Sequence, residues 1–156
     1  MHKISKSLLL VAAGVTLGTS TALVEQTPTV TYAATMSQEN FDLANRDIAD
    51  YLGNCQQYEQ NDQTFKGFTS IKSIKYTKNN QIKVDVNDDI YQLPKARRTL
   101  LIQTLQNGVY GTLADNNLKK LSEKDIEKGC KTTIYLNGHV IGHSSTNDTR
   151  KISWNK

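Results

Sequence analysis

The chain reads Thr132-Thr133-Ile134-Tyr135-Leu136-Asn137-Gly138-His139-Val140-Ile141 near its C-terminal end. Asn-Gly between two β-favouring runs predicts a hairpin with a two-residue type I′ turn, because both turn residues must adopt positive φ. The turn also predicts the register: Leu136 faces His139, Tyr135 faces Val140, Ile134 faces Ile141 and Thr132 faces His143. This hairpin is the strongest local structural signal in the chain.

Two segments before it show the same period of two. Ile74 and Tyr76 alternate with Lys75, and after the turn Lys78-Asn79-Asn80 the residues Ile82, Val84 and Val86 alternate with Lys83 and Asp85. One apolar face and one polar face predict a sheet that is covered on one side and wet on the other. Residues 151–154 are expected to add a last strand, with Trp154 covering an edge of the core.

The first helix is expected to start after Ser37, a plausible N-cap. Its apolar stripe recurs at three- and four-residue steps and consists of Phe41, Ala44, Ile48, Leu52 and Cys55. Gly53 weakens the last turn, so the helix either includes Cys55 or stops just before it, with 54–63 as a loop.

A second helix is expected to begin at Pro94, because proline suits the first helical position. Its apolar face consists of Leu100, Leu101, Ile102 and Leu105. Gly108 is its expected C-terminal cap, which makes 109–113 a linking turn. Ser122 and Asp125 have the spacing of a capping box and predict a short third helix that ends at Lys128.

These elements predict an α+β fold for residues 34–156. We expect a single two-layer domain with an antiparallel sheet, in the order helix, hairpin, helix, hairpin. The segment contains no internal repeat and no low-complexity tract, and Pro94 is its only proline, so no domain boundary is indicated.

Residues 1–33 are expected to be a cleaved signal peptide. Lys3 and Lys6 precede an uncharged, mostly apolar run, 8–17, which is shorter than the roughly 20 residues that span a bilayer. Small residues suit cleavage after Ala22 or Ala33, and we favour Ala33 because the residues before it show no helix or strand period. We therefore expect no integral membrane segment in the mature form.

Composition excludes several classes of protein. The chain has 156 residues, 37% of them hydrophobic, and a net charge of +4, which excludes a multi-span membrane protein and a disordered tail. Without residues 1–33, 17 basic and 14 acidic side chains leave a net charge of +3. That charge is too small for a nucleic-acid binder. The tightest basic group, Lys95, Arg97 and Arg98, is typical of a solvated helix start.

The two cysteines, Cys55 and Cys130, are expected to form a disulfide, because export places them in an oxidising compartment. Two free thiols are the alternative. A catalytic thiol is a third: Cys130 precedes the strand that pairs with the one carrying His143, so a Cys-His nucleophile pair of a small hydrolase is geometrically allowed. A Cys55–Cys130 disulfide would exclude that pair.

No metal or cofactor is expected. His139 and His143 are four apart on a predicted strand, so they lie about 13 Å apart and cannot share one zinc ion. The chain contains no glycine-rich phosphate loop, no Gly-x-Ser-x-Gly elbow and no His-Glu-x-x-His motif.

The leader Lys3-Ile4-Ser5-Lys6, the Thr/Asn/Lys/Gln-rich mature part and the 133–139 hairpin resemble small uncharacterised exported proteins of lactic-acid bacteria. The resemblance implies secretion from a Gram-positive cell. From export we expect the product to be extracellular or loosely associated with the cell wall. We expect a non-catalytic binding or interaction module whose partner is an extracellular protein or an anionic cell-wall polymer. The small secreted Cys-His hydrolase is the alternative, and a secreted inhibitor or toxin-protection protein fits the same size.

Overall fold

The computed structural model describes residues 36–119 and 121–155. In chain order the elements are α1 (Gln38–Tyr58), β1 (Ile71–Thr77), β2 (Gln81–Val86), α2 (Lys95–Asp115), α3 (Glu123–Lys128), β3 (Lys131–Leu136), β4 (His139–Ser144) and β5 (Ile152–Trp154). Three 3-10 helices occupy Gln63–Phe65, Phe68–Ser70 and Asp88–Gln92. The expected signal peptide, 1–33, with its cleavage positions after Ala22 and Ala33, lies outside the described residues.

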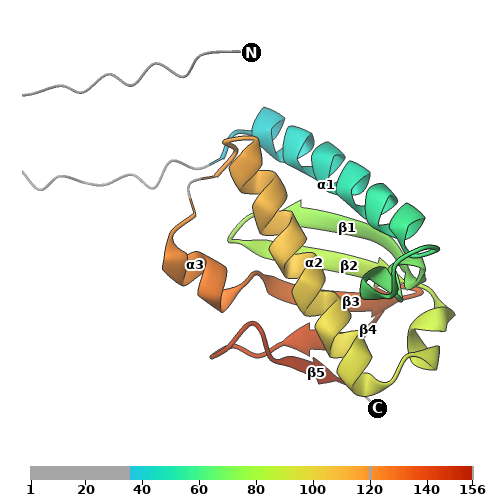
Figure 1. The fold of residues 1–156 in the computed structure, drawn as a ribbon. Helices are drawn as coiled ribbons and strands as arrows, with labels where there is room; N and C mark the ends of the chain where they lie inside the picture. Colours follow the sequence, from blue (N-terminus) through green and yellow to red (C-terminus); the bar gives the residue numbers. More distant parts are fainter. Residues whose placement is uncertain (1–35, 120, 156) are drawn as a thin grey trace, which may run out of the picture. The chain divides into compact units, whose positions relative to one another are not determined.

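The strands form one sheet in the order β1-β2-β3-β4-β5 (Figure 1), which confirms the α+β class and the sequence of helices and hairpins. The sequence predicted an antiparallel sheet, but one pair of strands departs from this. β2 and β3 run parallel, with Ile82 beside Thr132 and Val84 beside Ile134. Parallel neighbours cannot be joined by a tight turn. The chain instead returns from β2 to β3 through α2 and α3.

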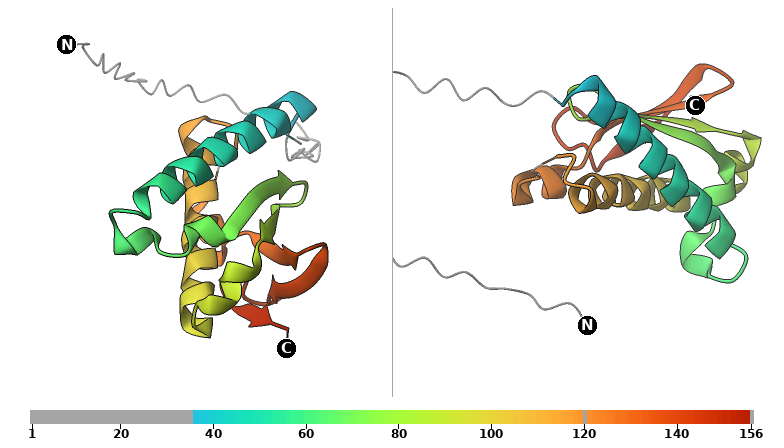
Figure 2. Two further views of the ribbon diagram at one scale, coloured as in Figure 1. Left: turned by 90° about the vertical axis from the view of Figure 1, so that its right-hand side faces the viewer. Right: turned by 90° about the horizontal axis from the view of Figure 1, so that it is seen from above.

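Both long helices lie on one side of the sheet (Figure 2), and no described helix covers the other side. Apolar side chains fill the layer between helices and sheet. From the strands these include Ile74, Tyr76, Ile82, Val84, Val86, Ile134 and Ile152, and from the helices Ile48, Leu52, Leu101, Ile102, Leu105 and Leu113. The period of two in the strands therefore produces one dry face and one wet face, as predicted.

Helix α1 begins where expected, since Ser37 Oγ accepts a backbone N–H at 3.2 Å. The predicted apolar stripe is buried, and Gly53 does not end the helix, which continues to Tyr58. α1 also supplies hydrogen-bond partners to backbone groups at the outer edge of β1. Asn45 Oδ1 accepts from Tyr76 N at 2.7 Å, and Asn45 Nδ2 donates to Tyr76 O at 3.1 Å. A side-chain amide thus takes the place of a neighbouring strand.

Gly108 is not a helix cap, and this corrects the expected end of the second helix. α2 continues through Gly108 to Asp115 and buries apolar residues of the segment expected to be a turn. A Cβ atom on Gly108 would lie 2.0 Å from Tyr51 Cζ. The glycine lets the Tyr51 ring on α1 approach the backbone of α2, so its role depends on a residue far away in the sequence.

A buried glutamine joins α2 to the C-terminal half of the sheet. Gln106 Nε2 lies within hydrogen-bond distance of the carbonyl oxygens of Cys130 at 2.8 Å and Thr149 at 2.9 Å and of Thr132 Oγ1 at 2.9 Å, and its two N–H groups are shared among these acceptors. Gln106 is fully buried, so leaving a buried acceptor here without a donor would carry a desolvation cost of about 1–3 kcal/mol. The amide therefore holds α2, β3 and the β4–β5 connection in one arrangement.

The predicted hairpin turn and the predicted capping box are confirmed. Asn137 and Gly138 have φ of 49° and 81°, as a type I′ turn requires. Leu136 pairs with His139 in the expected register. Ser122 and Asp125 form a capping box at the start of α3.

Beyond the turn, the register of β3 and β4 differs from the predicted one. A bulge makes Ile134 pair with Gly142 in place of Ile141, and Thr133 with His143 in place of Thr132. A Cβ atom at Gly142 would lie 3.1 Å from Trp154 Cε3. Gly142 makes room for the Trp154 ring. The bulge adds one residue to β4, and Ile141 is therefore buried as well.

The glycine argument predicts opposite effects of two matched substitutions in α2. Gly108→Ala should lower the free energy of unfolding by about 1–3 kcal/mol, because its methyl group overlaps the Tyr51 ring. Gly111→Ala should raise it by about 0.5–1 kcal/mol, because nothing lies within 4 Å and alanine favours the helix. Urea unfolding monitored by circular dichroism measures both, and equal effects would contradict the packing of α1 on α2.

Candidate functional site

The expected disulfide between Cys55 and Cys130 is not formed; both are buried free thiols. Cys55 lies beside Gln56, whose side-chain amide donates to Ile71 O at 2.8 Å, at the start of β1. Cys130 directly precedes β3, which begins level with the end of β1. Cys55 therefore lies near the start of β1 and Cys130 near its end, and β1 is about 20 Å long. A disulfide requires Cα atoms within about 7 Å of each other.

The structure does not bring Cys130 and His143 together. The Cys130 side chain is fully buried under α2, with Sγ 4.0 Å from Asn80 Oδ1, whereas His143 is exposed on the face of the sheet away from the helices. Burial raises the pKa of Cys130 to about 11, against the opposing effect of the Tyr110 hydroxyl. The thiol therefore stays protonated near neutral pH, which does not suit a nucleophile.

The bulge separates the two histidines of β4. His143 pairs with Thr133 on the wet face, whereas His139 pairs with Leu136. Side chains alternate along a strand, so Leu136 points to the face opposite that of its neighbour Tyr135, and His139 points to the same face as Leu136. Within 36–119 and 121–155 no group of three or more His, Cys, Asp or Glu side chains is arranged to hold a metal ion.

Two members of the basic group 95–98 have structural contacts. The Arg97 guanidinium donates to the carbonyl oxygens of Gln63, Thr64 and Lys66 at 2.8–3.1 Å and so organises the loop after α1. The Arg98 guanidinium carbon lies 4.9 Å from the ring centroid of Trp154, a cation–π contact that secures β5 to α2. These contacts differ from the solvated helix start expected from the sequence.

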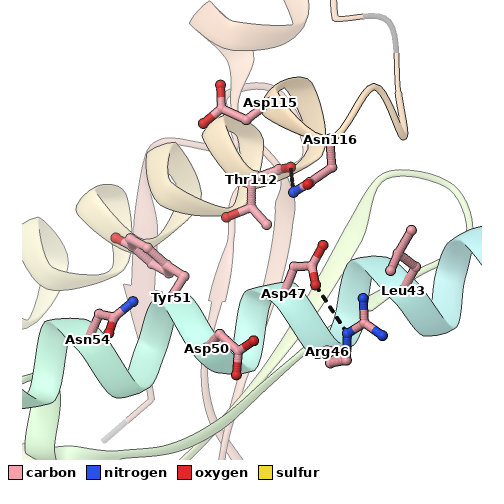
Figure 3. Close-up of a pocket in the computed structure, with 9 residues that line it drawn as sticks. All are labelled: Leu43, Arg46, Asp47, Asp50, Tyr51, Asn54, Thr112, Asp115 and Asn116. Atoms are coloured by element: carbon pink, nitrogen blue, oxygen red, sulfur yellow. Dashed lines mark hydrogen bonds and ion pairs between the residues drawn. The ribbon is translucent and has the colours of Figure 1, made fainter.

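A cleft of about 500 Å³ lies between α1 and the C-terminal part of α2 (Figure 3). Its lining comprises Leu43, Arg46, Asp47, Asp50, Tyr51, Asn54, Thr112, Asp115 and Asn116. Asp47 points toward α2, but its Oδ1 lies 3.3 Å from Arg46 Nε, and Asp50 and Asp115 point away from the facing helix. The carboxylates therefore do not converge on a common point, as a cation site would require.

The wet face of the sheet carries a continuous row of polar side chains. The pairings place Lys75 beside Lys83, Lys83 beside Thr133, Thr133 beside His143, and His143 beside Ser153. Paired residues point to the same face, so this row, which we call the cross-strand row, runs over all five strands. At 4.7–4.9 Å between strands it is about 19 Å long.

Positive charge gathers at one end of this face. Lys75, Lys83 and Lys131 are exposed there, and Asp85 is the one acidic strand residue on the face. Asp85 Oδ2 accepts from Ser73 Oγ at 3.0 Å. In the described part of the chain, the ion pairs within 4.0 Å join Arg46 to Asp47 and Asp148 to Lys151, so none of these three lysines has a carboxylate partner.

The Lys75–Lys83 pair is an unfavourable arrangement for the protein alone. Like charges directly opposite each other on neighbouring strands destabilise a sheet. An anion bound between the two ammonium groups would remove the repulsion. The cross-strand row with Lys131 is therefore our candidate functional site.

Sequence patterns located only part of this site. The alternation in the first hairpin predicts a polar face that includes Lys75 and Lys83, but nothing in it indicates a neighbour for Lys83 on its other side. Thr133 becomes that neighbour through the parallel pairing of β2 with β3, and His143 joins the row through the bulge. The part of the site that the sequence does indicate is the pair Lys75 and Lys83, at matching positions of the 74–84 hairpin.

The free thiols can be tested without any ligand. In denaturant without reductant, both cysteines should react with a chromogenic disulfide reagent, whereas in the native protein burial should make both react slowly. A Ser153→Cys variant, with a thiol on the exposed face, provides a control that should react rapidly in the native state. Reaction only after reduction would contradict the arrangement of Cys55 and Cys130.

None of the helices in residues 36–119 and 121–155 is both long and apolar enough to cross a membrane. The chain matches no protein-family model, no curated protein and no solved structure.

Proposed function

We propose that this protein is a secreted, non-catalytic binding module that holds an anionic polymer of the cell envelope against the wet face of its sheet. The observation that carries the proposal is the exposed pair Lys75 and Lys83, which lie directly opposite each other on neighbouring strands and have no carboxylate partner among residues 36–119 and 121–155. An extended polyanion supplies the missing negative charge.

The form of the surface supports a polymer over a small ligand. The cross-strand row lies on a sheet face that no described helix covers, and it extends for about 19 Å with most of its side chains exposed. Small ligands are bound mainly in concave pockets that remove most of their surface from water. An open row of donors suits a chain that lies along it and makes several weak contacts at once.

A charge-neutralising pair of substitutions tests the proposal. A lysine beside an anionic surface contributes about 1 kcal/mol, so Lys75→Gln with Lys83→Gln should weaken retention on isolated Gram-positive cell walls about 30-fold. Lys124→Gln with Lys128→Gln on α3 removes the same charge elsewhere and should have little effect. Cosedimentation at increasing salt measures both, and retention of the native protein should fall as salt rises.

Stability provides a second measurement that separates binding from misfolding. Neutralising Lys75 and Lys83 removes a repulsive cross-strand pair, so the variant should be at least as stable as the native protein at low salt. Retention that is equal for the two double variants, or absent for the native protein at low salt, would overturn the proposed function.

A further inference from the structure

The two ends of the cross-strand row differ in chemistry. Lys75 and Lys83 on β1 and β2 carry ammonium groups, whereas Thr133, His143 and Ser153 on β3, β4 and β5 offer two hydroxyls and an imidazole for hydrogen bonds. A ligand that fits the whole row therefore carries negative charge at one end and uncharged polar groups at the other.

The charged end suits a phosphate group. Lys75 and Lys83 are directly opposite, with Cβ atoms about 4.5–5.5 Å apart, and Lys131 lies two residues from Thr133, diagonally across from Lys83 at about 7–8 Å. Lysine acts as a compact point charge with three donors, which suits the several oxygens of a phosphate. A planar carboxylate is matched best by the fork of an arginine, and the face has none on its strands.

The neutral end suits a hydroxylated unit. The Thr133 and Ser153 hydroxyls both donate and accept hydrogen bonds, and the His143 ring lies between them. From Lys83 to Ser153 the row crosses three strand spacings, about 14 Å. This length accommodates a polyol or sugar unit next to the anionic group.

Asp85 determines the direction of the ligand. It lies two residues from Lys83 along β2 and on the same face. A polyanion that followed β2 from Lys83 toward the end of the strand would meet this carboxylate. A polyanion that crosses the strands meets Thr133 and then His143, so it avoids the negative charge.

From this arrangement we infer that the ligand is a linear polyol or sugar phosphate that lies across the strands, with a phosphate at Lys75, Lys83 and Lys131 and a hydroxylated unit over Thr133, His143 and Ser153. This inference rests on the proposed function and names its ligand class. The polymer places an anionic group next to hydroxyl groups, just as the row places two lysines next to hydrogen-bonding side chains.

Titration calorimetry with soluble polymers tests the inference. At one ionic strength, poly(glycerol phosphate) should bind at least tenfold tighter than polyglutamate of matched charge, and neutral dextran should bind more weakly than either. Thr133→Val with Ser153→Ala removes two hydroxyls and should weaken poly(glycerol phosphate) binding about tenfold while leaving polyglutamate unchanged. Thr64→Val, which removes an exposed hydroxyl from the 3-10 helix Gln63–Phe65, is the control and should change neither.

The outcomes distinguish the inference from the function on which it rests. Equal affinity for the two polyanions, with no effect of Thr133→Val and Ser153→Ala, would overturn the phosphate assignment and leave a general polyanion module. Failure of the native protein to bind either polyanion would overturn both. Loss of polyglutamate binding in the hydroxyl variant would also overturn the assignment, because it would indicate a disturbed face and not a lost specific contact.

Discussion

Burial of only one face of the five-stranded sheet is the constraint on which the rest of the structure depends. α1 and α2 cover the apolar face, and the alternation of side chains along each strand then places every second residue in water. The same alternation that supplies Ile82 and Val84 to the core places Lys83 on the open side. The core and the candidate site are thus two consequences of one pattern.

The crossover through α2 gives the open face its composition. A simple antiparallel continuation would join β2 to β3 through a short turn, whereas the observed parallel pairing requires the long connection that α2 supplies. Gln106 holds that helix against the backbone at Cys130 and Thr149. The parallel pairing places Thr133 beside Lys83, so the charged hairpin continues into the hydroxyl-bearing one.

Local signals in the sequence predicted local structure well. The Ser37 cap, the Ser122–Asp125 capping box and the Asn137-Gly138 turn each depend on residues within a few positions, and the structure confirms all three. Gly108 and the cysteines were interpreted wrongly because their roles depend on distant partners. Tyr51 explains the glycine, and the length of β1 keeps the two thiols apart. The lysine pair was visible as a pattern, but its neighbours across the sheet were not.

The central claim, that a polyanion lies along the cross-strand row, is tested most directly by nuclear magnetic resonance. In a titration of the labelled protein with poly(glycerol phosphate), amide shifts should change at Lys83, Thr133 and His143, and change little at Asp47 and Thr112 in the α1–α2 cleft. Shifts confined to the cleft, or none on the open face at saturating polymer, would contradict the account.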